Sequence, residues 1–256
     1  MFEPFAIIFN QRIPTMTVAL ILTTLFSLAW VLWQSPSHQR GRVLDVCLGA
    51  IVVGVVIGRL AHVTIHWEFF SERTQLIGRL SQEGGLTWQV FAMSALIAGS
   101  LLAHWRDVSF AWLLKTIAIL VPLIALVSWY ACATVGCAYG EPVQRMADYP
   151  AWLTWIAPDI YRLEMPRFAT QALGMTSSLV LLIVALILHL INWLEKTRFW
   201  LMLIVIALTS FSIGFLRGDT TWIVADLRIG QILDAIIILF SLIAIVVHSL
   251  AQKTAS

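Results

Sequence analysis

Long apolar stretches constrain the fold of this chain more than any other feature of its sequence. About 20 consecutive apolar residues are enough to cross the hydrocarbon core of a bilayer. Hydrophobic residues make up 60% of the 256 residues and charged residues only 12%, about half of the share found in soluble domains. The composition therefore excludes an ordinary soluble protein. The lack of a clustered basic face also excludes a nucleic-acid-binding role.

Seven apolar segments have the length of a membrane span. Backbone groups in lipid must pair within their own segment, so these segments are expected to be helices. The alternating polarity of a transmembrane barrel is not visible. We predict an all-α polytopic membrane protein with a single domain over residues 1–256, in which a small extracytoplasmic cap of long loops covers a seven-helix bundle. The predicted spans are residues 15–33, 43–65, 88–104, 111–134, 170–193, 199–216 and 229–250.

The short loops between the predicted spans indicate the orientation. Lys and Arg are dense in the short loops on one side and after the last span, at residues 39–42, 105–106, 195–198 and Lys253. Because short loops with positive charge stay in the cytoplasm, we predict an outer N-terminus and a cytoplasmic C-terminus. The long connections that form the outer cap are residues 67–87, 135–169 and 217–228.

The three cysteines do not suggest a disulfide framework. Cys47 lies in the second predicted span, whereas Cys132 and Cys137 lie near the end of the fourth. A buried cysteine usually serves as a small apolar side chain, and we predict this role for all three. The alternative is a redox pair that exchanges electrons with a quinone, which would need a partner pair that the chain lacks.

Charged and titratable side chains enter the outer ends of two spans. Arg59 lies in the last third of the second span, and His62 and His66 share its helical face. The histidine pair could ligate a metal or a haem, but no third ligand is clearly placed, so we expect no metal and no other cofactor. Asp234 lies inside the seventh span, where a carboxylate is costly unless it is paired. We expect an arginine as its partner.

Four arginines lie on the predicted outer side, namely Arg59, Arg167, Arg217 and Arg228. The planar fork of a guanidinium group suits a phosphate. A ring of such forks above an apolar bundle predicts a site for the headgroup of an anionic phospholipid.

The polar strings at the outer ends resemble, in order and spacing, those of the prolipoprotein diacylglyceryl transferase family. The resemblance extends over residues 15–250. The matching strings are Gly58-Arg59-Leu60, Gly84-Gly85-Leu86-Thr87-Trp88, Gly136-Cys137-Ala138-Tyr139-Gly140-Glu141-Pro142, Arg167-Phe168-Ala169-Thr170-Gln171, Phe215-Leu216-Arg217-Gly218-Asp219 and Ile229-Gly230-Gln231. Six strings in one order are more specific than any one of them.

The resemblance implies an enzyme of the bacterial plasma membrane with seven spans and an outer N-terminus. Such an enzyme moves the diacylglyceryl group of phosphatidylglycerol onto the cysteine thiol of a prolipoprotein lipobox and releases glycerol phosphate. The reaction needs cations that neutralise the leaving phosphate. It also needs a group that deprotonates a thiol with a pKa of about 8.5.

The resemblance also implies roles for particular residues. The predicted catalytic residues are Arg217 and His62, the latter as a titratable substitute for a missing base. The predicted substrate-binding residues are Arg59, Gly84, Gly85, Gln89, Trp129, Tyr139, Gly140, Arg167 and Gln171. We expect one cavity, open to the outer side and sideways to lipid, to hold Arg59, Tyr139, Arg167, Gln171 and Arg217.

Several positions depart from the family pattern. Trp129, Glu141 and Ser210 replace family arginines, and Gln89 replaces a family histidine. The departures favour an alternative, in which the chain is a catalytically degraded homologue that acts as a phospholipid-binding or assembly protein of the membrane. Phosphatidylglycerol or another anionic phospholipid is the expected partner in both cases, and a lipobox peptide is expected for the enzyme. A haem or quinone protein is the third hypothesis.

Overall fold

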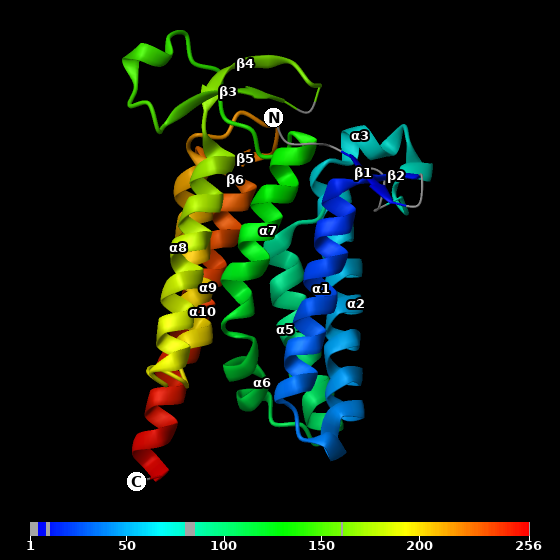
Figure 1. The fold of residues 1–256 in the computed structure, drawn as a ribbon, viewed down its shortest axis with the longest axis vertical. Helices are drawn as coiled ribbons and strands as arrows, with labels where there is room; N and C mark the ends of the chain where they lie inside the picture. Colours follow the sequence, from blue (N-terminus) through cyan, green and yellow to red (C-terminus); the bar gives the residue numbers. More distant parts are fainter. Residues whose placement is uncertain (1–4, 9–10, 80–84, 160, 256) are drawn as a thin grey trace.

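Long helices that run side by side form the body of the molecule (Figure 1). The structure is a computed structural model that describes residues 5–8, 11–79, 85–159 and 161–255. The helices of the bundle are α1 (Thr15–Gln34), α2 (Arg40–Ile65), α5 (Trp88–Trp105), the shorter α6 (Phe110–Ile117), α7 (Leu120–Val135), α8 (Thr170–Leu190), α9 (Arg198–Gly214) and α10 (Ile229–Ala255). Strands β1 and β2 lie at one end of the bundle and the C-terminus lies at the other.

Within the described residues, four segments are long and apolar enough to cross a membrane, namely Thr15–Gln34, Ser37–Ile65, Thr170–Leu190 and Ile229–Val247. The pair α6 and α7 also qualifies if it is counted as one broken span. Helix α9 is apolar but shorter, and with α5 it lies among the other helices of the bundle. A mainly helical membrane protein is therefore supported, whereas the count of seven crossings stays a prediction.

The predicted span over residues 111–134 is not one straight helix. Helices α6 and α7 meet at a bend of 50°. Pro122 lies in the first turn of α7, where it has no N–H to donate to the carbonyl of Ala118 and its ring crowds that carbonyl. The helix is consequently broken at Ala118 and Ile119. Each of the other predicted spans coincides with one helix whose ends are shifted by a few residues.

In the part of the chain that the structure describes, three two-stranded antiparallel hairpins add to the predicted all-α fold. They are β1 (Phe5–Ile8) with β2 (Gln11–Pro14), β3 (Thr154–Pro158) with β4 (Glu164–Phe168), and β5 (Ile223–Val224) with β6 (Leu227–Arg228). The short helices are α3 (Trp67–Ser71), η1 (Ser37–Gln39), η2 (Thr74–Leu76) and η3 (Met146–Asp148). The cap predicted from the long loops thus contains strands that the sequence did not reveal.

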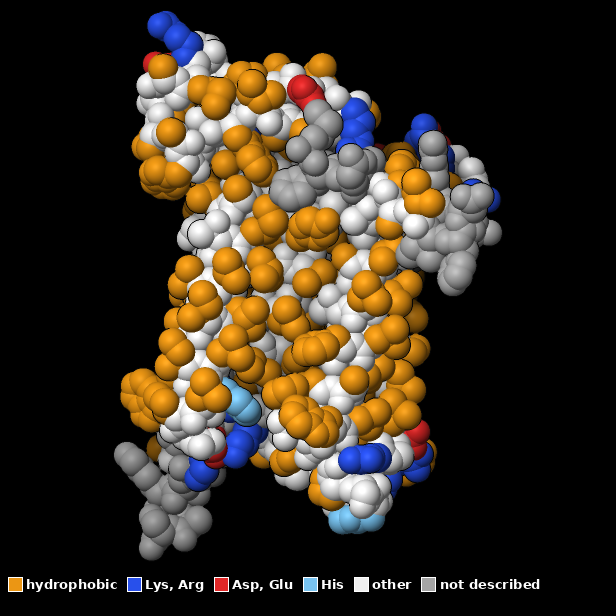
Figure 2. Space-filling view, in the orientation of Figure 1, with side chains coloured by type: hydrophobic (Ala, Val, Ile, Leu, Met, Phe, Trp, Pro, Cys, Tyr) orange, Lys and Arg blue, Asp and Glu red, His pale blue; other side chains and the backbone are white. Residues whose placement is uncertain are grey.

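Apolar side chains cover the flank of the bundle as well as its interior. Val43, Val46 and Ala185 are fully buried in the core. On the flank, Leu190 and Leu239 are 77% and 60% exposed. Figure 2 shows this hydrophobic flank between two ends at which the Lys and Arg side chains gather. Soluble monomers rarely expose so continuous an apolar surface, so the flank is the surface that faces lipid.

Glycine allows two of the helices to approach closely. A Cβ atom placed on Gly174 of α8 would lie 2.1 Å from the indole ring of Trp129 on α7. The indole therefore lies directly on the α8 backbone, an arrangement typical of membrane helix interfaces, which are enriched in small residues.

We expect Gly174→Ala to lower the apparent Tm of the purified protein in detergent, because the new methyl group overlaps the Trp129 ring. Overpacking of this kind costs about 1–3 kcal/mol. Gly41→Ala is the matched control, since a Cβ there meets no atom within 4 Å. Equal apparent Tm values for the two variants would contradict the tight contact between α7 and α8.

Candidate functional site

Most of the polar residues that the sequence singled out lie at one end of the bundle. Helices α2, α7 and α9 end there, α5, α8 and α10 begin there, and the three hairpins cover it (Figure 1). We call it the outer end, in line with the predicted orientation.

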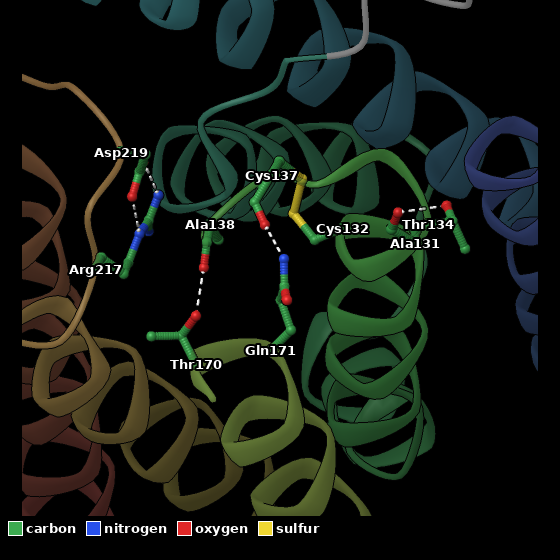
Figure 3. Close-up of a disulfide and its surroundings, with 9 residues drawn as sticks. All are labelled: Ala131, Cys132, Thr134, Cys137, Ala138, Thr170, Gln171, Arg217 and Asp219. Carbon is green, nitrogen blue, oxygen red and sulfur yellow. Dashed lines mark hydrogen bonds and ion pairs between the residues drawn. A yellow bond between two sulfur atoms is a disulfide. The ribbon is translucent and has the colours of Figure 1, made fainter. Parts of the chain in front are cut away.

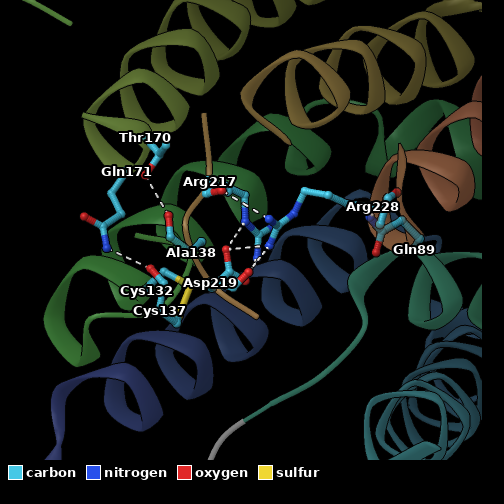
Figure 4. A network of polar contacts seen from close by, with 10 residues as sticks. Gln89, Cys132, Cys137, Ala138, Thr170, Gln171, Arg217, Asp219 and Arg228 are labelled. Atoms are coloured by element: carbon cyan, nitrogen blue, oxygen red, sulfur yellow. Dashed lines mark hydrogen bonds and ion pairs between the residues drawn. A yellow bond between two sulfur atoms is a disulfide. The ribbon is translucent and has the colours of Figure 1, made fainter. Parts of the chain in front are cut away.

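Arg217, Asp219 and Arg228 form a group of ion pairs at the outer end (Figure 4). Arg217 donates from Nε to Oδ1 of Asp219 at 2.8 Å and from Nη2 to Oδ2 at 2.5 Å. Nη2 of Arg228 lies 3.0 Å from the same Oδ1, and its Nη1 donates to the carbonyl oxygen of Arg217 at 3.1 Å. We call these three residues the Arg–Asp–Arg cluster. Their side chains stay 29%, 21% and 16% exposed in chain order, so a ligand can reach them.

The turn that follows α7 is held by the first turn of α8 (Figure 3). Gly136 ends α7 in the left-handed region, with a φ of 76°, as is common at helix C-termini. Oγ1 of Thr170 donates to the carbonyl oxygen of Ala138, and Nε2 of Gln171 donates to that of Cys137, both at 2.7 Å. The amide of Gln171 thus positions the turn.

Gly140 joins this turn to two distant segments. It forms an isolated β-bridge with Arg217, and its near neighbour Pro142 forms one with Arg167. A Cβ atom on Gly140 would lie 2.1 Å from the carbonyl oxygen of Phe168. Close backbone packing therefore explains why a glycine lies beside the Arg–Asp–Arg cluster.

Cys132 and Cys137 form a disulfide bond (Figure 3), so the prediction that both are apolar fillers is wrong. Their Cα atoms are 4.8 Å apart, because the chain reverses at Gly136 between them. A spacing of five residues did not reveal this reversal. Cys47 is a free, partly buried thiol. Disulfides persist in oxidising compartments, which agrees with an extracytoplasmic outer end.

Thiol counting tests the disulfide. We expect the protein, denatured in SDS without reductant, to take up one maleimide label at Cys47, and three labels after reduction, because the chain contains three cysteines. Intact mass spectrometry reads both numbers directly. Cys47→Ser is the control and should give no label before reduction. Three labels on the unreduced protein would contradict the bond.

Arg167 is buried in an ion pair. Its Nη2 atom lies 2.9 Å from Oδ2 of Asp159, and only 4% and 9% of the two side chains is exposed. The guanidinium carbon also lies 4.9 Å from the centre of the Tyr139 ring. Burial, followed by the charges of Asp219 and Asp159, raises the pKa of the Tyr139 hydroxyl. Tyr139 is therefore a neutral hydrogen-bonding group beside the cluster.

Arg59 holds the loop that precedes α5. It donates from Nε to the carbonyl oxygen of Ile77 at 3.0 Å, from Nη2 to that of Leu76 at 2.9 Å, and from Nη1 to that of Gly85 at 2.9 Å. Its guanidinium carbon lies 5.0 Å from the centre of the Phe70 ring. These contacts within the protein account for its burial, whereas its predicted contact with a headgroup phosphate stays a prediction.

His62 packs against the same loop. Gly85 has a φ of 80°, and a Cβ on it would lie 2.2 Å from Nε2 of His62. The predicted partner of Gly85, Gly84, lies outside the described residues. The centres of the His62 and His66 rings are 4.5 Å apart. His62 is thus confined between the loop backbone and His66.

His66 couples electrostatically to the Arg–Asp–Arg cluster. Burial lowers its pKa, while Asp219 acts to raise it and Arg217 to lower it further. Because the resulting pKa lies below the ordinary value of about 6.5, the imidazole is neutral at pH 7 and can accept a proton. The sequence placed His66 on the helical face of Arg59, but it assigned the catalytic role to His62.

Asp234 pairs with a glutamine, so the expectation of an arginine partner is wrong. Nε2 of Gln89 donates to Oδ1 of Asp234 at 2.8 Å and to the carbonyl oxygen of Gly230 at 3.2 Å. Both side chains are buried. The amide that replaces a family histidine thus ties the start of α5 to the start of α10.

Trp129 lies deeper in the bundle, six residues before the end of α7, which is roughly 9 Å along the helix. It borders a small cavity between α7, α8 and α9. The other residues that line this cavity are Ser177, Ser178, Leu181, Ile206 and Thr209. Where the family pattern has an arginine, these residues offer an indole and hydroxyl groups, and none of them carries a positive charge.

The residues predicted to share one cavity all lie at the outer end, but their polar groups have different partners. Arg59 and Gln171 bind backbone carbonyls, and Arg167 binds Asp159. Arg217 and Arg228 are the predicted arginines that meet at an accessible cluster. No local sequence pattern marks Asp159 in its long loop, so its pairing with Arg167 was not predicted. The substrate-binding roles stay predictions.

A bundle with an apolar flank and an accessible group of ion pairs at one end defines a polytopic membrane protein with a polar site near the membrane surface. The model of the prolipoprotein diacylglyceryl transferase family matches residues 5–247. The chain therefore belongs to this family, and the resemblance inferred from the sequence strings is confirmed.

Curated relatives cover most of the chain. A phosphatidylglycerol–prolipoprotein diacylglyceryl transferase of Lysinibacillus sphaericus is 25% identical over 253 residues, which is 95% of this chain and 91% of the relative. A protein of the same name from Bacillus mycoides is 28% identical over 80% of this chain and 76% of its own length. Another, from Clostridium novyi, is 23% identical over 83% of this chain and 82% of its own length.

The contacts of Arg59 generate a prediction about the loop before α5. We expect Arg59→Ala to make the chain around Leu76 and Ile77 sensitive to limited proteolysis, because the carbonyl groups that Arg59 binds lose a charged donor, each bond being worth about 1.5–3 kcal/mol. Arg59→Lys should protect only partly, since an ammonium cannot reproduce the fork. Arg79→Ala, an exposed arginine in the same loop, is the control. Equal resistance of Arg59→Ala and the wild-type protein to the protease would show that Arg59 does not hold this loop.

Proposed function

We propose that this protein is a membrane transferase that moves the diacylglyceryl group of a phospholipid onto the cysteine thiol of a prolipoprotein lipobox. Membership of the family supports the reaction class. The observation that carries the proposal is the Arg–Asp–Arg cluster, in which two partly exposed guanidinium groups meet at the outer end. Phosphatidylglycerol, which appears in the names of the relatives, is the first donor to test.

The proposed reaction assigns two tasks to the outer end. The thiolate sulfur forms a bond to the terminal glyceryl carbon, and the bond from that carbon to the phosphate oxygen breaks. Arg217 and Arg228 stabilise the negative charge that develops on the leaving phosphate, as preorganised cations do in other phosphate sites. The thiol proton passes to a base, for which we favour His66 over His62, because the charges of Asp219 and Arg217 act on His66.

The proposal includes the predicted topology, with seven spans, an outer N-terminus and a cytoplasmic C-terminus in the bacterial plasma membrane. The odd number of crossings fits the opposite placement of β1 and the C-terminus in the bundle (Figure 1). The Cys132–Cys137 disulfide at the outer end supports an oxidising outer compartment. The lipobox thiol and the cluster would then meet on the same side of the membrane.

A second function is a phospholipid-binding or assembly protein without transferase activity. It is favoured by the small cavity between α7, α8 and α9, which Trp129 and hydroxyl groups line in place of a family arginine. It is also favoured by Arg59 and Arg167, because both side chains bind other groups of the protein, namely a backbone carbonyl and Asp159. On this hypothesis the outer end still holds a headgroup, but the charge on a leaving phosphate is not stabilised well enough for transfer.

Reporter lipidation decides between the two functions. In bacterial cells depleted of their own transferase, we expect this protein to attach lipid to a secreted lipobox reporter, seen as a mass increase that is lost when the lipobox cysteine is replaced by serine. Arg217→Ala should reduce lipidation about 10- to 100-fold, because one charged hydrogen-bond donor is lost.

Arg145→Ala is the matched control, because Arg145 is an exposed arginine in the same long outer connection as Tyr139. It should leave lipidation unchanged. An unmodified reporter, together with phospholipid that copurifies with the wild-type protein, would overturn the transferase proposal and favour the binding protein.

A further inference from the structure

We propose that the outer site takes a zwitterionic phospholipid headgroup, a phosphate ester that also carries an ammonium group, in preference to a net anionic one. This inference rests on the proposed function, because it names the lipid class for the same site. It follows from the carboxylate that Glu141 adds beside the Arg–Asp–Arg cluster.

The backbone fixes Glu141 next to the cluster. Its N–H donates to the carbonyl oxygen of Leu216 at 2.9 Å, and its own carbonyl accepts from the N–H of Phe168 at 3.1 Å. A Cβ atom on Gly218 would lie 2.9 Å from the Cα atom of Glu141. Since Gly218 separates Arg217 from Asp219 in the chain, Glu141 lies directly against the segment that carries the cluster.

The side chain of Glu141 is exposed, and its charge acts on Arg228. It is therefore available to a ligand in a way that Asp219 is not, because both arginines already bind the Asp219 carboxylate. Glu141 is thus the carboxylate of this site that can pair with a cation from outside.

The charges of the site cancel. Arg217 and Arg228 contribute two positive charges, and Asp219 and Glu141 contribute two negative charges, so these four described side chains sum to zero. Arg167 brings no net charge because Asp159 neutralises it. Arg59 keeps its positive charge, but it is buried and its donors are used by backbone carbonyls. A neutral group of charges exerts little long-range pull on a net anion.

Separated charges of both signs suit a ligand with the same pattern. The phosphate of the headgroup would face the guanidinium groups of Arg217 and Arg228, which bind phosphate well. The ammonium group would face Glu141. Phosphoethanolamine and phosphocholine headgroups both carry this pattern, whereas phosphoglycerol lacks the ammonium group and would leave Glu141 facing an anion.

The transfer step balances with such a donor as it does with phosphatidylglycerol. The carbon–sulfur bond forms, the carbon–oxygen bond to phosphate breaks, and the electron pair leaves with the phosphate oxygen. The thiol proton goes to the base, and the released product is the phosphate monoester of the amino alcohol. No oxidant or reductant is needed.

The test measures lipid retention and lipid transfer separately. The purified full-length protein in neutral detergent is mixed with vesicles that contain equal amounts of phosphatidylethanolamine, phosphatidylcholine and phosphatidylglycerol, and the retained lipids are quantified by mass spectrometry. We expect the two zwitterionic lipids together to be enriched over phosphatidylglycerol roughly two- to fivefold, the range of a partly exposed ion pair. The ratio of the two shows whether the methyl groups of choline matter.

Variants identify the residue responsible. Glu141→Gln should remove the preference, and Glu141→Arg should reverse it in favour of phosphatidylglycerol. Glu164→Arg, which makes the same charge change at an exposed position on β4, should leave the preference as in the wild type. Size-exclusion profiles and the disulfide confirm that each variant is folded.

The outcomes separate this inference from the proposed function. Retention that favours phosphatidylglycerol in the wild type, equal retention of all three lipids, or an equal effect of Glu164→Arg and Glu141→Arg would overturn the headgroup inference. If the preference and its reversal are observed but no vesicle lipid is transferred to a lipobox peptide, the transferase proposal fails while the headgroup inference stands.

Discussion

The pairing of polar groups at the outer end of the bundle is the constraint on which the rest of the structure depends. Lipid offers no hydrogen-bond partners, so irregular backbone near the membrane must be satisfied by the protein itself. Arg59 meets this requirement for the loop before α5, and Gln171 and Thr170 meet it for the turn after α7. Arg167 and Asp159 do the same for the β3–β4 hairpin. Gln171, Thr170 and Arg167 lie near helix or strand ends, where the unpaired groups are, whereas Arg59 reaches its carbonyls from inside the last third of α2.

This constraint decides which charges are left for chemistry. An arginine whose donors are used by buried carbonyls, as in Arg59, cannot reorient toward a ligand without leaving those carbonyls unsatisfied, which is costly. Arg228 also donates to the backbone carbonyls of Arg217 and Asp219, but it shares the Asp219 carboxylate with Arg217, and both arginine side chains stay partly exposed. This exposure leaves both guanidinium groups accessible to a phosphate. The accessible cluster, rather than the deepest arginine, is thus the part of the outer end that suits a headgroup.

The sequence predicted local features well and distant pairings poorly. Span lengths follow from the thickness of the bilayer, so most helices were placed correctly, and the break before α7 follows from a local property of Pro122 that the hydropathy reading did not weigh. The Cys132–Cys137 bond, the Gln89–Asp234 pair and the Arg167–Asp159 pair depend instead on chain reversals and helix contacts. Apart from the family strings, the sequence offers no pattern that brings these residues together, and the strings do not include Asp159 or Asp234.

Within one family string, packing and chemistry can change independently. In the segment from Gly136 to Pro142, the two glycines are required by the left-handed helix end and by the carbonyl of Phe168, and the structure leaves room for no other residue at Gly140. Glu141 lies between Gly140 and Pro142, and its side chain is exposed to solvent, so nothing in the packing restricts its charge. A match to this string consequently supports the fold more strongly than it supports a particular donor lipid. Within this string, the charge at position 141 is the feature that can change with the headgroup of the donor lipid without disturbing the packing.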